Sequence, residues 1–193
     1  MSERNLNPFT QQRFAAGKEW PDTKILVLGI GNPATGDLGL GVAAVRELLA
    51  KYEFPAEVAV VDSDAGDMRL LALIAAAEQA FIIDAIESSS KPGSIFMFNS
   101  DELDVAPATR LSLNELDIAQ ALLASDLGGD ESTATIIGVQ PGRKRSFGDG
   151  LSREVRGAIP KIINIVIELL AASGFEPQPR TVDQSTASGA RIA

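Results

Sequence analysis

The sequence contains neither cysteine nor histidine among its 193 residues. Without cysteine the chain can form no disulfide, no thiolate metal site and no thiol nucleophile. Without histidine it lacks the usual general base near neutral pH and the commonest metal ligand. Any metal site must therefore use carboxylates, amides, backbone carbonyls or water, which are hard ligands.

Basic residues are also scarce, because 17 Lys and Arg stand against 26 Asp and Glu, for a formal net charge of −9. Such a balance disfavours nucleic acid as a partner, since the phosphates would repel the protein. No apolar run is long enough to cross a bilayer. Residues 1–21 contain no apolar core of a secretory signal. We therefore expect no nucleic-acid partner, no membrane partner and, by default, a cytoplasmic protein.

The length and the hydrophobic content of 45% suit one globular domain with a proper core. We place this domain at residues 23–173. Residues 1–22 show no periodicity and are predicted to form an N-terminal arm, which either packs its aromatic side chains onto the domain or binds a partner. Residues 174–193 are rich in Pro, Gln, Ser, Thr and Gly and are predicted to form a disordered tail.

Short apolar runs alternate with amphipathic segments throughout the domain. Strands are predicted at 24–30, 57–62, 79–84, 94–98 and 133–139, and helices at 40–52, 67–77, 112–124 and 152–172. Pro160 should kink the last helix or divide it in two. Strands that are nearly unbroken apolar runs between helices are typical of an α/β domain with a mostly parallel sheet covered on both faces.

Polar residues follow three consecutive predicted strands. They are Asn32 and Asp37 after the first strand, Asp62 and Asp64 after the second, and Asp84 at the end of the third. The carboxyl ends of parallel strands meet at one edge of a sheet. The group could form a cation or catalytic carboxylate site, or each Asp could cap the next helix or turn. Asp84 stands beside apolar residues and needs a partner to offset its desolvation.

A glycine-rich segment at 29–34 raises the question of nucleotide binding. It lacks the third glycine of GxGxxG, and the chain contains no GxxxxGK[ST] loop. Nucleotide binding therefore remains only a minor alternative.

A basic loop at 142–150 contrasts with the acidic character of the chain. It contains Arg143, Lys144 and Arg145 in succession. The loop is either a solvated connection or a docking point for an acidic or C-terminal carboxylate segment of another protein.

Several short motifs occur together in a family's order and spacing, over about residues 24–170. They lie at 25–32, 36–42, 60–62, 82–86, 111–116, 137–141 and 150–155. On these motifs the chain resembles the hydrogenase maturation proteases, endopeptidases that remove a C-terminal extension from the large subunit of nickel–iron hydrogenases. The resemblance implies a three-layer α/β/α sandwich around a five-stranded sheet. It also implies that the partner is the hydrogenase large-subunit precursor, which supplies the nickel.

The resemblance further implies three positions that recognise nickel. The family Asp at the end of the third strand is kept as Asp84, the family acid after the first strand is replaced by Leu38, and the family His is replaced by Asn114. Leucine cannot bind a metal, and an amide oxygen is a weak ligand for nickel. Asp37, next to Leu38, is a candidate substitute. The matching motifs also nominate substrate-binding residues, namely Asn32, Gly39 and Gln140.

Two functions from different classes follow from these changes. The chain is either a nickel-dependent processing endopeptidase with a rearranged site, or a non-cleaving family member that binds the precursor. Because the chain has no His or Cys, only an aspartate such as Asp84 could be nominated to activate water, and no residue is assigned to that role.

Overall fold

The computed structural model describes residues 23–63, 74, 77–99, 133–142, 148 and 150–180. Its elements are β1 (Ile25–Ile30), η1 (Pro33–Thr35), η2 (Asp37–Gly39), α2 (Leu40–Lys51), β2 (Tyr52–Glu53), β3 (Val58–Ser63), β4 (Gln79–Ala85), β5 (Ile95–Asn99), β6 (Thr133–Val139), α5 (Arg153–Ala172) and β7 (Gln178–Pro179). Several predicted features lie outside the described residues: the arm at 1–22, most of the helix at 67–77, the helix at 112–124 with Asn114, Asp64, the basic residues 143–145, and the chain beyond residue 180.

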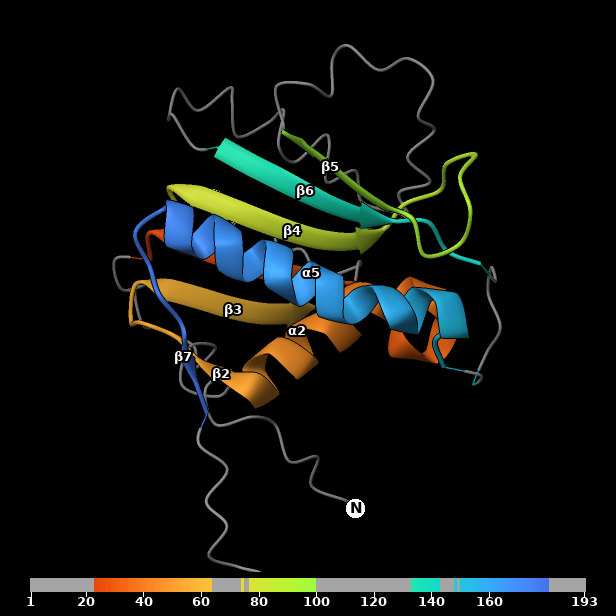
Figure 1. Cartoon of the computed structure of the whole chain (residues 1–193), viewed down its shortest axis with the longest axis horizontal. Helices are drawn as coiled ribbons and strands as arrows, with labels where there is room; N and C mark the ends of the chain where they lie inside the picture. Colours follow the sequence, from red (N-terminus) through yellow and green to blue (C-terminus); the bar gives the residue numbers. More distant parts are fainter. Residues whose placement is uncertain are drawn as a thin grey trace, which may run out of the picture.

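Five strands form one sheet in the order β3-β1-β4-β6-β5 (Figure 1). The first four strands are parallel, and β5 runs antiparallel to β6. The predicted α/β fold and mostly parallel five-stranded sheet are confirmed, and the predicted strand limits agree to within one residue. The strand that ends near Asp84, β4, occupies the middle of the sheet.

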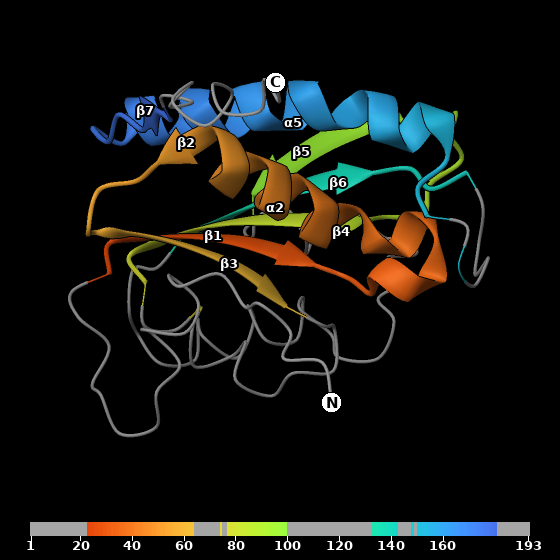
Figure 2. The ribbon, with the colours of Figure 1, turned by 90° about the horizontal axis from the view of Figure 1, so that it is seen from below.

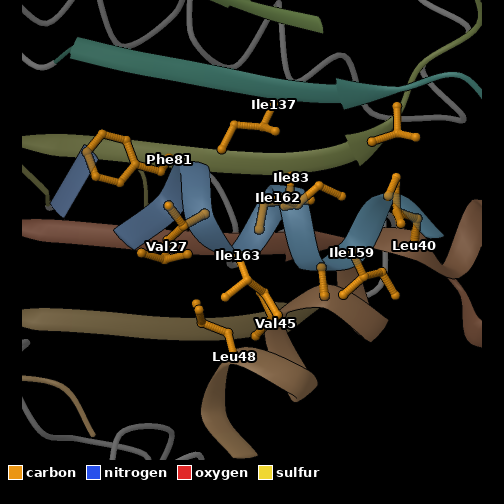
Figure 3. Packing of buried hydrophobic residues seen from close by; sticks show 14 of the residues in the cluster. Val27, Leu40, Val45, Leu48, Phe81, Ile83, Ile137, Ile159, Ile162 and Ile163 are labelled. Carbon is orange, nitrogen blue, oxygen red and sulfur yellow. The ribbon is translucent and has the colours of Figure 1, made fainter. Parts of the chain in front are cut away.

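Both α2 and α5 cover the same face of this sheet (Figure 2). Isoleucines 159, 162 and 163 of α5 recur at helical spacing and pack with Val45 and Leu48 of α2 over the sheet (Figure 3). Each fully buried aliphatic side chain contributes about 1.5–3 kcal/mol. This cluster fixes both helices to the strands.

The opposite face of the sheet is buried as well. Alternate residues of β1, among them Leu26 and Leu28, form a second cluster with Ile82 of β4. Ile74 and Ala77, from the segment predicted as a helix at 67–77, belong to this cluster. Burial on both faces agrees with the predicted three-layer arrangement.

Pro160 does not divide the last helix, so that part of the prediction is wrong. Helix α5 runs without interruption over Arg153–Ala172. Pro160 leaves the carbonyl of Arg156 without its helical donor, but both residues lie on the exposed side of α5, where water can hydrogen-bond to that carbonyl. Neither this helix nor the other in the described part of the chain is long and apolar enough to span a membrane.

The chain from 174 to 180 adopts a defined structure, whereas the sequence placed the start of a disordered tail at 174. Gly174, with a φ of 86°, ends α5, and the N–H of Phe175 donates to the carbonyl of Leu170 at 2.9 Å. β7 then pairs antiparallel with β2. Phe175 packs against the cluster formed with α2 and α5, and Pro177 is buried. The rest of the segment is held by backbone pairing and by Arg180, which composition alone does not reveal.

Candidate functional site

Close glycine contacts bring the start of α2 against the ends of β1 and β4. A Cβ atom on Gly41 would lie 2.3 Å from the carbonyl oxygens of both Ile30 and Ile83. A Cβ atom on Gly29 would lie 2.1 Å from the carbonyl oxygen of Gly41. Only glycine permits these approaches. The helix therefore begins directly beside Ile83, the residue that precedes Asp84.

The loop before α2 folds back tightly upon itself. Gly31 has a φ of 139°, and a Cβ atom there would lie 2.0 Å from the carbonyl oxygen of Leu38. A Cβ atom on Gly39 would lie 2.6 Å from the Cα atom of Pro33. The backbone at residue 38 is thus held against the end of β1, and the Leu38 side chain is half-buried. Gly39, nominated for substrate binding, is buried and serves this packing.

Asn32 shapes the first turn of the loop. Its Oδ1 accepts a hydrogen bond from the N–H of Ala34 at 2.9 Å. Its carbonyl oxygen accepts from the hydroxyl of Thr35 at 2.7 Å. The side-chain oxygen of this nominated substrate-binding residue is therefore used as a turn cap.

Asp84 lies at the carboxyl end of the central strand and is half-buried. Its Oδ1 accepts a hydrogen bond from the N–H of Ala85 at 2.7 Å. No Lys or Arg among the described residues forms an ion pair with it. Burial raises the pKa of Asp84 from its ordinary value of 3.8 to about 7, although the bond from Ala85 acts in the opposite direction. A desolvated carboxyl group without a cationic partner is a candidate functional group.

Asp37 is in a different situation, because its carboxylate accepts hydrogen bonds from the chain. Only 1% of its surface is exposed. Its Oδ1 accepts from the N–H of Ser152 at 2.6 Å. Its Oδ2 accepts from the hydroxyl of Ser152 at 2.9 Å and from the N–H of Gly142 at 2.8 Å. These bonds join the loop before α2 to the turn after β6 and to the start of α5.

The sequence did not predict the partners of Asp37. Ser152 was identified as a helix start, and it does cap α5 by accepting from the N–H of Val155. The second use of its hydroxyl, as a donor to Asp37, depends on a contact between residues 115 positions apart. The sequence shows an Asp in the loop at 31–41 and a Ser at the start of a helix. Neither feature specifies that the two residues are in contact.

Gln140 connects the loops that follow β4 and β6. Its Oε1 accepts from the N–H of Ser88 at 2.6 Å and from the Ser88 hydroxyl at 2.8 Å. Its Nε2 donates to the carbonyl oxygen of Pro141 at 2.9 Å. The side-chain amide of this nominated substrate-binding residue is thus buried and bonded within the protein.

The strand-end acids share one edge but do not form one cluster. Asp62 lies opposite Gly29 in the parallel register and pairs with Arg46 of α2 at 2.9 Å. Gly29 also lies opposite Ile83, so Asp62 and Ile83 point to the α2 face and Asp84 to the other face. Among the described residues, no three acidic groups gather closely enough to hold a metal ion.

The chain matches a family model described as hydrogenase maturation protease over residues 42–169. The hydrogenase 2 maturation protease of Escherichia coli is 31% identical over 159 residues, which are 81% of this chain and 96% of that protein. A hydrogenase expression/formation protein, HupD of Bradyrhizobium diazoefficiens, is 32% identical over 162 residues, 83% of this chain and 84% of that protein. Among solved structures, the hydrogenase maturating endopeptidase HybD from Escherichia coli superposes with a TM-score of 0.73 and 30% identity, covering 81% of this chain and 98% of that one.

Proposed function

The chain belongs to the hydrogenase maturation protease family, and we propose that it is a processing endopeptidase that removes the C-terminal extension of a nickel–iron hydrogenase large-subunit precursor after nickel insertion. Family members are hydrogenase maturation endopeptidases. The proposal goes beyond the family in naming the substrate and the metal it carries.

One observation carries the proposal: Asp84 is a half-buried carboxyl group at the end of the central strand, without a cationic partner among the described residues. Its charged form is costly in this environment. A metal cation that arrives with the substrate would stabilise the carboxylate and lower its pKa. Asp84 would in this way recognise the precursor in its nickel-loaded form and reject the metal-free form.

The residues of this chain suit a metal that is already bound to the substrate. They are less suited to a metal that this protein would have to hold alone. The sequence has no His or Cys, and position 38 carries a leucine. A single carboxylate offers nickel only one side-chain ligand, and a hard one. We therefore treat the nickel as part of the substrate, to which Asp84 adds an oxygen ligand.

The raised pKa of Asp84 also bears on whether this carboxyl group could accept the proton of the attacking water. A pKa near 7 matches neutral pH, which is favourable for a general base. Nickel binding and proton acceptance would both use the carboxylate oxygens of Asp84. A substrate-bound metal at Asp84 would favour the ligand role, because the cation lowers the proton affinity of the carboxylate.

The second candidate function is a non-cleaving protein that binds the precursor. The specific observation in its favour is that two of the three nickel-recognising positions implied by the resemblance carry other residues here, Leu38 and Asn114. Such a protein would keep the fold and the surface that contacts the precursor, but not the cleavage.

Incubation of the purified chain with nickel-loaded precursor separates the two functions. The endopeptidase yields a large subunit shortened at its C-terminus, which mass spectrometry of the intact protein detects, and metal-free precursor serves as the control. A stable complex with an uncleaved precursor would instead support the binding protein.

A further inference from the structure

The carboxylate of Asp37 joins three segments that are far apart in the sequence. It lies in η2, immediately before residue 38, and is buried. It accepts hydrogen bonds from Gly142 in the turn after β6 and from Ser152 at the start of α5. We propose that Asp37 is a positioning residue, which holds the loop at 31–41 in place beside the end of β4, and not a metal ligand.

Both oxygens of this carboxylate are used within the protein. Hydrogen bonds to a charged acceptor are stronger than those between neutral groups. The negative charge also lies at the N-terminus of α5, where the helix dipole stabilises it. The Ser152 hydroxyl donates to Asp37 and accepts from the N–H of Val155, which one hydroxyl can do at once. Turning Asp37 toward a metal would break these bonds. The neighbouring Leu38 cannot bind the metal, so no second ligand there would offset their loss.

A second bond fastens the same two loops together. The N–H of Gly148 donates to the carbonyl oxygen of Ala34 at 3.1 Å. The loop before α2 is therefore tied to the connection between β6 and α5 at two places, through Ala34 and through Asp37. On its other side the loop is tied to the sheet, because Gly41 packs on the carbonyl of Ile83.

These contacts form a continuous path from α5 to the candidate site. The path runs from Ser152 to Asp37, along η2 to Gly41, and through Ile83 to Asp84. Loss of the Asp37 carboxylate would release one side of the loop while the sheet still holds the other. A displacement of about 1 Å in a catalytic arrangement can lower a rate by about 100-fold. The effect on cleavage rests on the proposed function, whereas the effect on the loop does not.

The test compares Asp37→Asn with Ser152→Ala and with Glu47→Gln as a matched control. Asp37→Asn keeps the shape but presents an amide NH₂ to donors, so it loses at least one bond. Ser152→Ala removes only the hydroxyl and keeps the backbone N–H that donates to Asp37. Glu47→Gln neutralises an exposed carboxylate of α2 that pairs with Lys51, away from the network. Thr23→Ala would not be a suitable control, because Thr23 is buried and its loss could itself destabilise the protein.

Two readouts are required, amide hydrogen exchange and precursor cleavage. In Asp37→Asn we expect faster exchange at Gly142 and Ser152, and also at Gly39, whose N–H donates to the carbonyl of Gly36 within the loop. Strand amides of β1 should keep their protection. The turnover rate should fall by about 10- to 100-fold, with little change in the precursor concentration that gives half the maximal rate. Ser152→Ala should show a smaller change in the same direction, and Glu47→Gln none.

Faster exchange confined to Gly142 and Ser152, with Gly39 and turnover at wild-type values, would overturn the proposal, because Asp37 would then only cap α5. Nickel-dependent stabilisation lost in Asp37→Asn but kept in Ser152→Ala would also overturn it, since that pattern indicates a ligand. Should the wild-type protein cleave no precursor, the proposed function fails, and the exchange at Gly39 alone then supports or overturns the positioning role.

Discussion

Asp62 and Asp84 lie near the carboxyl ends of their strands, at the same edge of the sheet, but their side chains point to opposite faces. Gly29 of β1 lies opposite Asp62 on one side and opposite Ile83 on the other. Partners in a parallel register share a face, so Asp84, one residue further, faces away from Asp62. The strand between them therefore separates an exposed ion pair, Arg46 with Asp62, from the half-buried, desolvated carboxyl group of Asp84. A common metal site for the two acids does not follow from their common edge.

The pKa of Asp84 predicts how the stability of the free protein depends on pH. Burial raises this pKa from 3.8 to about 7, so between these values the folded state keeps a proton that the unfolded state has lost. The free energy of unfolding should therefore fall as the pH rises from about 4 to about 7, and level off above. Below about pH 4 the group is protonated in both states and has no effect.

Asp84→Asn isolates this contribution, because the amide oxygen can still accept from the N–H of Ala85. One pKa unit corresponds to about 1.4 kcal/mol, and solvent screens the exposed part of the group. We expect the variant to be more stable than the wild type by about 2–4 kcal/mol at pH 8 and equal to it at pH 4. Urea unfolding at both pH values measures the difference. A difference that does not change with pH would contradict the assigned pKa.

Gly41→Ala should strongly destabilise the protein. Its Cβ atom would lie 2.3 Å from the backbone oxygens of Ile30 and Ile83, which cannot move without disturbing the sheet. We expect a loss of about 1–3 kcal/mol or more, as for other overpacked positions. Gly157→Ala is the matched control, because a Cβ atom there meets no described atom within 4 Å. That change should stabilise α5 by about 0.5–1 kcal/mol, and thermal unfolding of the pair compares the two.

Arg180→Ala tests whether the segment after α5 contributes to stability. The backbone N–H of Arg180 donates to the carbonyl of Lys51 at 2.8 Å, and its Nε donates to the carbonyl of Tyr52 at 3.1 Å. Loss of the side-chain bond should cost about 1 kcal/mol. Glu53→Ala removes only an exposed ion pair at 3.8 Å, which should cost less than about 0.5 kcal/mol. Arg180→Ala also removes the ion pair, so equal effects of the two changes in denaturant unfolding would show that the bond from Arg180 Nε to Tyr52 contributes nothing measurable.

Pro160→Ala should stabilise the protein, since it restores the helical donor to the carbonyl of Arg156 without touching the core. Pro160 is exposed, so the change creates no cavity. We expect a gain of about 1–3 kcal/mol, up to the difference in helix propensity between the two residues. Chemical denaturation gives this value, and a loss of stability would indicate that the proline has packing contacts that the exposed position does not suggest.

The sequence predicted the parts of the fold that depend on local pattern. Apolar runs such as the one ending near Ile30 gave strand limits within one residue, because a fully buried strand must be apolar throughout. The sequence left open whether Pro160 kinks or divides α5, because the outcome depends on solvent exposure. It did not predict the pairing of β7 with β2, which depends on backbone bonds between distant segments.

The sequence predicted single positions of the candidate site but not the contacts between them. The position of Asp84 at a strand end and its need for a partner followed from its apolar neighbours. The bonds from Asp37 to Ser152 and from Gln140 to Ser88 join residues 115 and 52 positions apart, and no local pattern specifies such contacts. The nominated binding roles of Asn32, Gly39 and Gln140 remain predictions, and the structure shows that these residues also have internal roles.

The most direct test of the account compares wild-type protein with Asp84→Asn on nickel-loaded hydrogenase large-subunit precursor, with the intact mass of the precursor as the measurement. We predict a precursor shortened at its C-terminus with the wild type, and no shortened product with Asp84→Asn, whose neutral amide cannot supply a carboxylate to the metal. Cleavage by Asp84→Asn at the wild-type rate would contradict the role assigned to Asp84.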